Sequence, residues 1–243
     1  YIGVEGNPAP NMKANVNLNI LGRVAENPIN EIFYENRGRT QTVDTPDGPV
    51  VIGDNNMANR NTQGFGLVPA GTLGSTPATS GQGKYKIDAG YTTTIYNGGA
   101  VASAAGYIVN GQTAAAPIIG VLNGIFYNAA NTLKPTFANF YLQPITPANS
   151  EDIDAFVIDN PTQQYIVATD DTVAQAGYLE TYDMNNSGGD NTTGKSAATL
   201  DIATTGADDK TFRLLRSAED PENNTNAAYR SVVVVANLLE LQS

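Results

Sequence analysis

From Tyr85 onward, apolar residues occur in short runs that alternate with polar positions, and turn residues separate the runs. Such alternation between turns is typical of β-strands. The expected strands are Tyr85–Asp88, Thr92–Tyr96, Ala100–Ala104, Ile118–Tyr127, Thr136–Leu142, Ala155–Asp159, Gln164–Thr169, Tyr178–Asp183, Thr211–Arg216 and Arg230–Leu238. The pairs Asn97-Gly98, Asn110-Gly111 and Asn123-Gly124 suit hairpin turns or bulges. Because no helical pattern of ten residues separates these strands, we predict an all-β body, an antiparallel β-barrel or β-sandwich.

Residues 1–84 have a different pattern, in which only three segments have the character of strands. These segments are 14–21, 32–35 and 49–52, the last of them after the turn Pro46-Asp47-Gly48. Within 14–21, Val16, Leu18 and Ile20 alternate with asparagines. The stretches between the segments are rich in Asn, Gly and Pro and cannot easily bury a core of their own. We therefore predict an extended N-terminal arm and linker over 1–84, followed by the β body over 85–243.

The composition excludes much of the chemistry that enzymes use. The chain of 243 residues has no Cys, no His and no Trp. It therefore cannot form a disulfide, a thiolate nucleophile, a cysteine zinc site or a Ser-His-Asp triad. The remaining acid and base groups would need strongly perturbed pKa values to act near neutral pH. We expect a protein that is not an enzyme, has no catalytic residues and carries no cofactor.

The net charge of −11 is distributed unevenly along the sequence. Residues 1–84 contain 6 basic and 7 acidic residues, whereas 85–243 contain 7 basic and 17 acidic residues. An acidic body repels nucleic acid and anionic lipid, because phosphate binding needs clustered Lys and Arg. No run of 18 apolar residues occurs, and the first residues lack a signal-peptide pattern. We expect neither a nucleic acid nor a membrane as partner.

One segment matches a well-known motif. Gly189-Asp190-Asn191-Thr192-Thr193-Gly194-Lys195-Ser196 satisfies the phosphate-loop pattern, in which backbone amides and the lysine hold phosphates. Only 47 residues follow Ser196, which is too few for the strands and helices that complete such a fold. Asp190 also places a negative charge inside the loop. We interpret the segment as a polar turn.

Two further sets of polar residues could form a metal site or a catalytic pair, or could be solvated loop residues. Asp183-Met184-Asn185-Asn186-Ser187-Gly188 begins like a calcium loop, but its twelfth position is Gly194, where such a loop needs a bidentate Glu. The carboxylates of Glu151 to Asp154, Asp170-Asp171 and Asp208-Asp209 could supply a glycosidase pair. Adjacent acids in turn-rich segments are usually solvated. We predict no metal site and no catalytic pair.

The order of the local patterns from Tyr85 onward resembles a known family of structural proteins. The stretches that carry the resemblance are Ala89 to Gly98, Pro117 to Tyr127, Lys134 to Tyr141, Ala155 to Pro161, Tyr165 to Val167, Thr193 to Asp201, Phe212 to Arg216, Glu219 to Asn223 and a final Val-rich strand. Their order is similar to that in capsid decoration, or cement, proteins of tailed bacteriophages of the marine type. The family often ends with an Asn and a His, whereas this chain has Asn237-Leu238-Leu239-Glu240.

The resemblance implies a virion structural protein on the capsid surface, outside the cell. Its partners would be the major capsid protein and further copies of itself, with a trimer as the expected form. The arm would add strands to neighbouring subunits, with Val16, Leu18 and Ile20 as its interface anchors. Two alternatives stay open: a fibre or pilus-like subunit that polymerises by strand addition, and a carbohydrate- or receptor-binding module.

Overall fold

The computed structural model describes residues 41–45, 48–52, 59, 61–74, 81–111, 117–185, 188–206, 209–219, 223 and 227–242. The chain divides into two compact units, Tyr1–Met57 and Ala58–Ser243. In the first unit, β1 (Gln41–Thr45) and β2 (Gly48–Ile52) form an antiparallel hairpin with Thr45 opposite Gly48. The strand expected over 49–52 is therefore confirmed. The expected anchors Val16, Leu18 and Ile20 lie outside the described residues.

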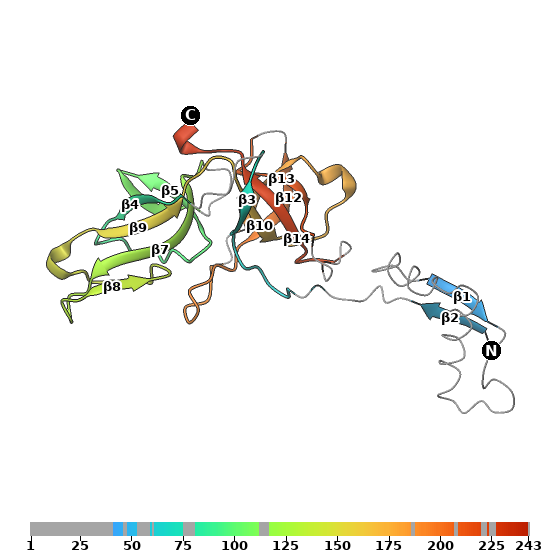
Figure 1. Ribbon diagram of the computed structural model, residues 1–243, viewed down its shortest axis with the longest axis horizontal. Coiled ribbons are helices and arrows are strands. Elements are labelled where there is room, and N and C mark those ends of the chain that lie inside the picture. Colours follow the sequence, from blue (N-terminus) through green and yellow to red (C-terminus); the bar gives the residue numbers. More distant parts are fainter. Residues whose placement is uncertain are drawn as a thin grey trace, which may run out of the picture. The chain divides into compact units, whose positions relative to one another are not determined.

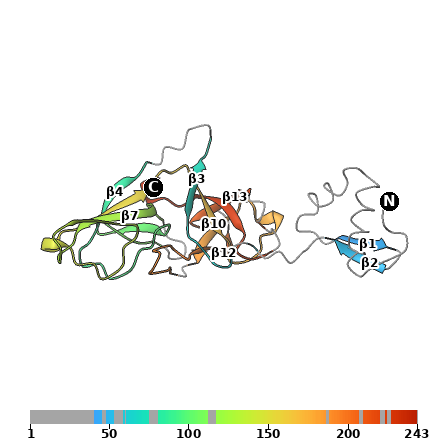
Figure 2. The same ribbon diagram turned by 60° about the horizontal axis from the view of Figure 1, so that its bottom comes forward.

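The second unit is all-β, as predicted, and contains two antiparallel sheets (Figure 1 and Figure 2). Sheet I has the order β12-β11-β13-β14-β10-β3, and sheet II has the order β4-β9-β7-β5-β6, with β8 added to β7. The strands of sheet I are β3 (Val68–Thr72), β10 (Gln163–Ala168), β11 (Thr181–Asn185), β12 (Thr199–Gly206), β13 (Phe212–Ser217) and β14 (Ser231–Ala236). Those of sheet II are β4 (Gly83–Ile87), β5 (Ala100–Ala104), β6 (Tyr107–Asn110), β7 (Gly120–Asn128), β8 (Pro135–Ala138) and β9 (Ile153–Ile158).

The unit contains two hydrophobic cores, one mainly from each sheet. In β9, Ile153, Ala155 and Val157 are buried on the inner face of sheet II, whereas Asp154 and Phe156 alternate with them on the outer face. In sheet I, the edge strand β12 is also joined to Thr169, the residue after β10, by an isolated bridge from Leu200. The core of sheet I also includes residues from the other sheet, such as Val121 and Ile158, so that the two sheets form one unit.

The compact unit begins earlier than the expected boundary between Lys84 and Tyr85. Leu67 is buried in the core of sheet I, and β3 pairs with β10 at the edge of that sheet. The expected boundary falls inside β4, which pairs with β9 over its whole length. Residues assigned to the arm therefore belong to the body, because their apolar side chains and backbone groups find partners far along the chain.

The net charge of each part is different when it is counted for these two units. Residues 1–57 contain 4 basic and 7 acidic residues, and 58–243 contain 9 basic and 17 acidic residues. Net charges of −3 and −8 are similar per residue, so the units do not differ as the sequence boundary suggested.

Most expected strands are present within one to three residues of their expected ends, but some predictions were wrong. The segment Thr92–Tyr96 is not a strand, since it makes only an isolated bridge from Ile95 to Tyr141. The strands β1, β3, β6 and β12 were not expected. Asn123-Gly124 lies at a register shift between β7 and β9, as expected for a bulge. In the described part of the chain, no helix is long and apolar enough to cross a membrane.

Candidate functional site

The segment that matches the phosphate-loop pattern connects β11 to β12 and forms a closed turn. The Asp190 N–H donates to the carbonyl of Lys195 (2.9 Å), and the Gly194 N–H donates to the carbonyl of Asp190 (2.7 Å). Gly194 has a φ of 74°, which favours glycine. The residues that follow Ser196 lead into strand β12, where a phosphate loop would lead into a helix. We call residues 189–196 the clasp loop.

The exposed carboxylate of Asp190 makes hydrogen bonds within the clasp loop itself. It accepts hydrogen bonds from the Thr192 N–H (2.8 Å) and the Thr193 hydroxyl (2.9 Å). These bonds, that from the Thr192 amide foremost, hold the pKa of Asp190 below its usual range. These two donors of the loop are therefore bonded to the Asp190 carboxylate. A phosphate that entered the loop would be repelled by the negative charge of this carboxylate. This geometry favours the interpretation as a polar turn.

Two aromatic residues from segments that flank sheet II, Tyr96 and Phe140, pack against the clasp loop. The rings of Tyr96 and Phe140 stack with centroids 6.0 Å apart and planes 6° apart. A Cβ on Gly189 would lie 2.5 Å from the Tyr96 ring, and one on Gly194 would lie 2.2 Å from the Phe140 ring. The Tyr96 hydroxyl also donates to Asn191 Oδ1 (2.7 Å). Both glycines are thus required for close packing, and the loop fastens sheet I to segments that flank sheet II.

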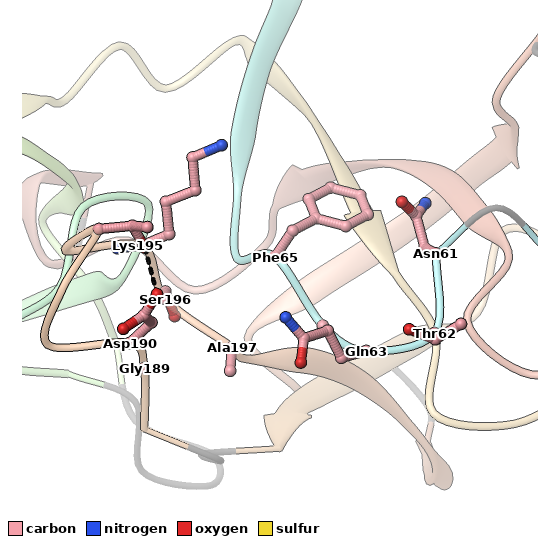
Figure 3. Close-up of a pocket in the computed structure, with 11 residues that line it drawn as sticks. Asn61, Thr62, Gln63, Phe65, Gly189, Asp190, Lys195, Ser196 and Ala197 are labelled. Atoms are coloured by element: carbon pink, nitrogen blue, oxygen red, sulfur yellow. Dashed lines mark hydrogen bonds between the residues drawn. The ribbon is translucent and has the colours of Figure 1, made fainter.

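A groove of about 480 Å³ separates the clasp loop from residues 61–65 (Figure 3). Lys195 and Asp190 come from the loop wall, and Asn61, Gln63 and Phe65 come from the facing segment. A second cavity of about 340 Å³ adjoins it and shares Asn61, Phe65 and Lys195. The groove offers amide groups, one ammonium group, one carboxylate and one aromatic ring. Such a lining can hold a polar ligand by hydrogen bonds and stacking.

The Phe65 segment was assigned to the arm, so sequence analysis missed this groove. The available signal was the sequence Phe65-Gly66-Leu67-Val68, an apolar cluster within a polar, glycine-rich stretch. Gly64 and Gly66 allow the segment to approach closely, because a Cβ on Gly64 would lie 2.1 Å from the carbonyl oxygen of Ala197.

Several of the acidic residues considered for catalysis or calcium binding have structural partners, whereas Asp208 lies outside the described residues. Asp154 accepts hydrogen bonds from the ammonium groups of Lys84 (2.7 Å) and Lys86 (2.6 Å). Burial alone would raise the pKa of Asp154, but these two lysines outweigh it and lower the pKa below its ordinary value. Asp170 Oδ1 accepts from the Ile202 N–H (2.9 Å). These contacts stabilise strand pairing and loop geometry.

Asp183, the first residue of the calcium-like segment, lies in β11 and is almost fully buried. Its Oδ1 accepts from the N–H and the hydroxyl of Thr211, both at 3.3 Å, and Lys210 Nζ lies 3.5 Å from Oδ2. The side chain is thus directed into the sheet and away from the following loop. Among the described residues, no three acidic side chains are grouped so that they could hold a metal ion.

Aromatic residues of sheet II contribute to its core and to cross-strand pairs. Tyr141 is fully buried in the core of sheet II, and Phe126 in β7 lies opposite Phe137 in β8.

Comparison of the chain with protein-family models, with curated proteins and with solved structures finds no match in any of the three.

Proposed function

We propose that the protein decorates and stabilises the shell of a bacteriophage capsid as a virion structural protein. The observation that carries this proposal is the place of the stretches that resemble decoration proteins. Pro117 to Tyr127 contains most of β7, Ala155 to Pro161 contains most of β9, and Phe212 to Arg216 forms most of β13. These strands supply both hydrophobic cores. The resemblance is therefore concentrated in the residues that determine the fold.

The division of the chain into two units is a second source of support. A decoration protein can hold a shell together when one part sits on the shell and another part reaches a neighbouring subunit. Residues 1–57 form a unit of their own. Forty residues precede β1, and such a length spans about 130 Å when fully extended. We propose that the residues before β1 span the distance to a neighbouring subunit.

The alternating segment 14–21 gives the arm a means of attachment. When an extended segment adds to an exposed sheet edge, main-chain hydrogen bonds provide affinity and alternate side chains enter pockets. Val16, Leu18 and Ile20 would all face the same side of such a strand, and the asparagines between them would face the other. We propose that these three residues anchor the arm on the shell.

The proposal is tested by co-sedimentation of the full-length protein with undecorated capsids of the phage that encodes it. We expect saturable binding at a fixed ratio to capsid subunits. The triple variant Val16→Asp, Leu18→Asp, Ile20→Asp should bind at least tenfold more weakly, because charged side chains would enter apolar sites.

The matched control places the same three charges on the opposite face of the segment. The variant Asn15→Asp, Asn17→Asp, Asn19→Asp has the same net charge and should bind capsids nearly as well as the wild type. Equal loss in both variants would show that charge alone matters. If the wild type binds no capsid and instead grows into filaments by itself, the fibre alternative is correct.

The polar groove beside the clasp loop favours a second candidate, a carbohydrate-binding module. Aromatic rings stack on the apolar faces of sugars, and amides hydrogen-bond to their hydroxyl groups. Phe65 and Gln63 provide these groups in the groove. A glycan-array screen of the full-length protein, repeated with Phe65→Ser, tests this candidate. It requires a bound glycan whose signal is lost in the variant.

A further inference from the structure

The hairpin of β7 and β8 exposes two large apolar side chains. Leu133 in its turn is 74% exposed and Phe137 in β8 is 67% exposed, the highest values among the exposed large hydrophobic residues of the described chain. Figure 1 shows β8 at an edge of sheet II, next to β7. Large apolar side chains in such positions are typical of surfaces that a partner covers.

The backbone of the turn gives Leu133 an unusual conformation. Its φ is 54°, in the left-handed region that glycine and asparagine occupy at lower cost. The Leu133 N–H donates to the carbonyl of Ala129 (2.8 Å), and the Ala129 N–H donates to the carbonyl of Lys134 (3.2 Å), which closes the turn. The turn thus contains a leucine at a position where glycine or asparagine would make the isolated body more stable. Such strain is common at functional positions.

Phe137 belongs to a row of aromatic side chains on the outer face of sheet II. It lies directly opposite Phe126, and its ring centroid is 5.9 Å from that of Phe156 in β9. The ring reaches Phe156 across Gly124 of β7, where a Cβ would lie 3.0 Å from Phe137 Cζ. A bulkier residue at position 124 would displace the ring. The row therefore crosses three strands and offers a continuous apolar surface.

The same hairpin also borders an apolar groove of about 560 Å³. Its lining includes Tyr127 and Ala138 from the two strands, together with Phe140, Leu142 and Ile145 from the segment after β8. The hairpin thus carries both protruding apolar side chains and a recess for apolar side chains. A surface that contains both is complementary to itself, as contacts between identical subunits require.

The charge of the hairpin also suits contact between two copies. Residues 128–138 contain one charged residue, Lys134, in a unit with net charge −8. Repulsion between two acidic bodies is weakest where their least acidic surfaces meet.

We propose that the β7–β8 hairpin is the surface through which copies of this chain associate, with Leu133 and Phe137 of one copy entering the groove of another. The biological setting, an oligomer on a shell, rests on the proposed function, whereas the contact itself does not. Leucine and phenylalanine side chains that become buried in such a recess exclude water and hold the copies together.

Sedimentation velocity of the full-length protein over a range of concentrations tests the proposal. We expect the wild type to form a small oligomer. Leu133→Gly and Phe137→Thr should each weaken association at least tenfold. Leu133→Gly should keep or raise the temperature of unfolding, because glycine suits the backbone at this position. Loss of association would then not reflect loss of folding.

Leu179 provides a matched control. It is also a leucine with positive φ (68°), and it is 62% exposed. Its backbone is held by bonds to the Leu214 carbonyl and from the Arg213 guanidinium, outside the hairpin. Leu179→Gly should leave association unchanged.

The absence of cysteine from the chain allows a direct second test. Leu133→Cys and Leu142→Cys are made separately, mixed and mildly oxidised. Disulfide-linked heterodimers should form faster from this mixture than from Leu179→Cys mixed with Leu142→Cys, because only the former residues meet in the proposed contact.

Three outcomes contradict the proposal: a monomeric wild type at all concentrations, an oligomer that persists in Leu133→Gly and Phe137→Thr, or equal cross-linking in both mixtures. A monomer whose capsid binding is lost in the two variants would assign the hairpin to the capsid partner. If the hairpin holds an oligomer that binds no capsid, the decoration role fails and the contact stands.

Discussion

The clasp loop can be interpreted as a structural turn or as a phosphate-binding loop. The two interpretations predict different effects of substitutions at the neighbouring residues Gly194 and Lys195. As part of a structural turn, Gly194 is essential because of its positive φ and its contact with Phe140. We expect Gly194→Ala to lower the free energy of unfolding by about 2 kcal/mol or more. Lys195→Ala should change it by less than about 0.5 kcal/mol, as is usual for an exposed side chain. Chemical denaturation of both variants measures the difference.

A phosphate-binding loop would give a different pattern. Lys195→Ala would then abolish the stabilisation of the protein by added nucleotide, with magnesium present. We expect no such stabilisation in the wild type, and a nucleotide-dependent rise in its unfolding temperature would contradict the structural role of the loop.

Asp154 links stability to pH. Its pKa is lowered in the folded protein, so its contribution to stability is present above about pH 4 and is lost as the pH falls through the lowered pKa. Both lysine partners are half-exposed, which limits the contribution to about 1 kcal/mol. We expect Asp154→Asn to reduce stability by about this amount at pH 7 and by less at pH 2.

Urea denaturation of the wild type and the variant at several pH values measures this dependence. Asp152→Asn, at an exposed carboxylate next to the same strand, is the control and should show a smaller change. A stability difference between wild type and Asp154→Asn that grows toward low pH would contradict the assigned role of the lysines.

At the scale of elements, alternation predicted the strands whose faces differ in polarity. β9 has buried Ile153, Ala155 and Val157 between more exposed neighbours, so a period of two was visible in the sequence. β14 was found for another reason: residues Ser231 to Val235 are all buried, and a continuous Val run is typical of a strand covered on both faces.

The missed strands lack these signals. β3 contains Pro69 and Gly71, which are uncommon inside strands, and its position depends on pairing with β10 about 95 residues later. β12 places Leu200 and Ile202 among polar residues and ends in a Thr-rich segment at the edge of the sheet. Conversely, Thr92–Tyr96 has the composition of a strand but only Ile95 finds a bridge partner. Non-local pairing decided each of these cases.

The segment before β3 offers a test of its place in the body. Leu67 is 1% exposed in the core of sheet I, whereas its neighbour Val68 is 44% exposed. We expect Leu67→Ala to lower the free energy of unfolding by about 3 kcal/mol, because it leaves a cavity. Val68→Ala should cost less than about 1 kcal/mol. Thermal and chemical unfolding measure both variants. Equal stability of Leu67→Ala and Val68→Ala would contradict the place of Leu67 in the core.

For the whole molecule, the predicted all-β body is confirmed, but its start was placed later in the sequence than the unit that begins at Ala58. Asn and Gly recur both before residue 58 and in the segment that leads into β3, so composition could not separate them. The groove beside the clasp loop and the apolar hairpin were likewise hidden, because each depends on residues brought together by folding. The expected anchors of the arm stay a prediction, since they lie outside the described residues.

The central claim is that this protein holds a capsid shell together, and the resistance of the shell itself tests it most directly. Undecorated capsids are heated with and without saturating full-length protein, and the temperature at which shells break is recorded by light scattering. We predict a higher breakage temperature with the protein, which falls back toward the undecorated value with the Val16, Leu18 and Ile20 triple Asp variant. Shells that break at the same temperature with and without the wild-type protein would contradict the claim.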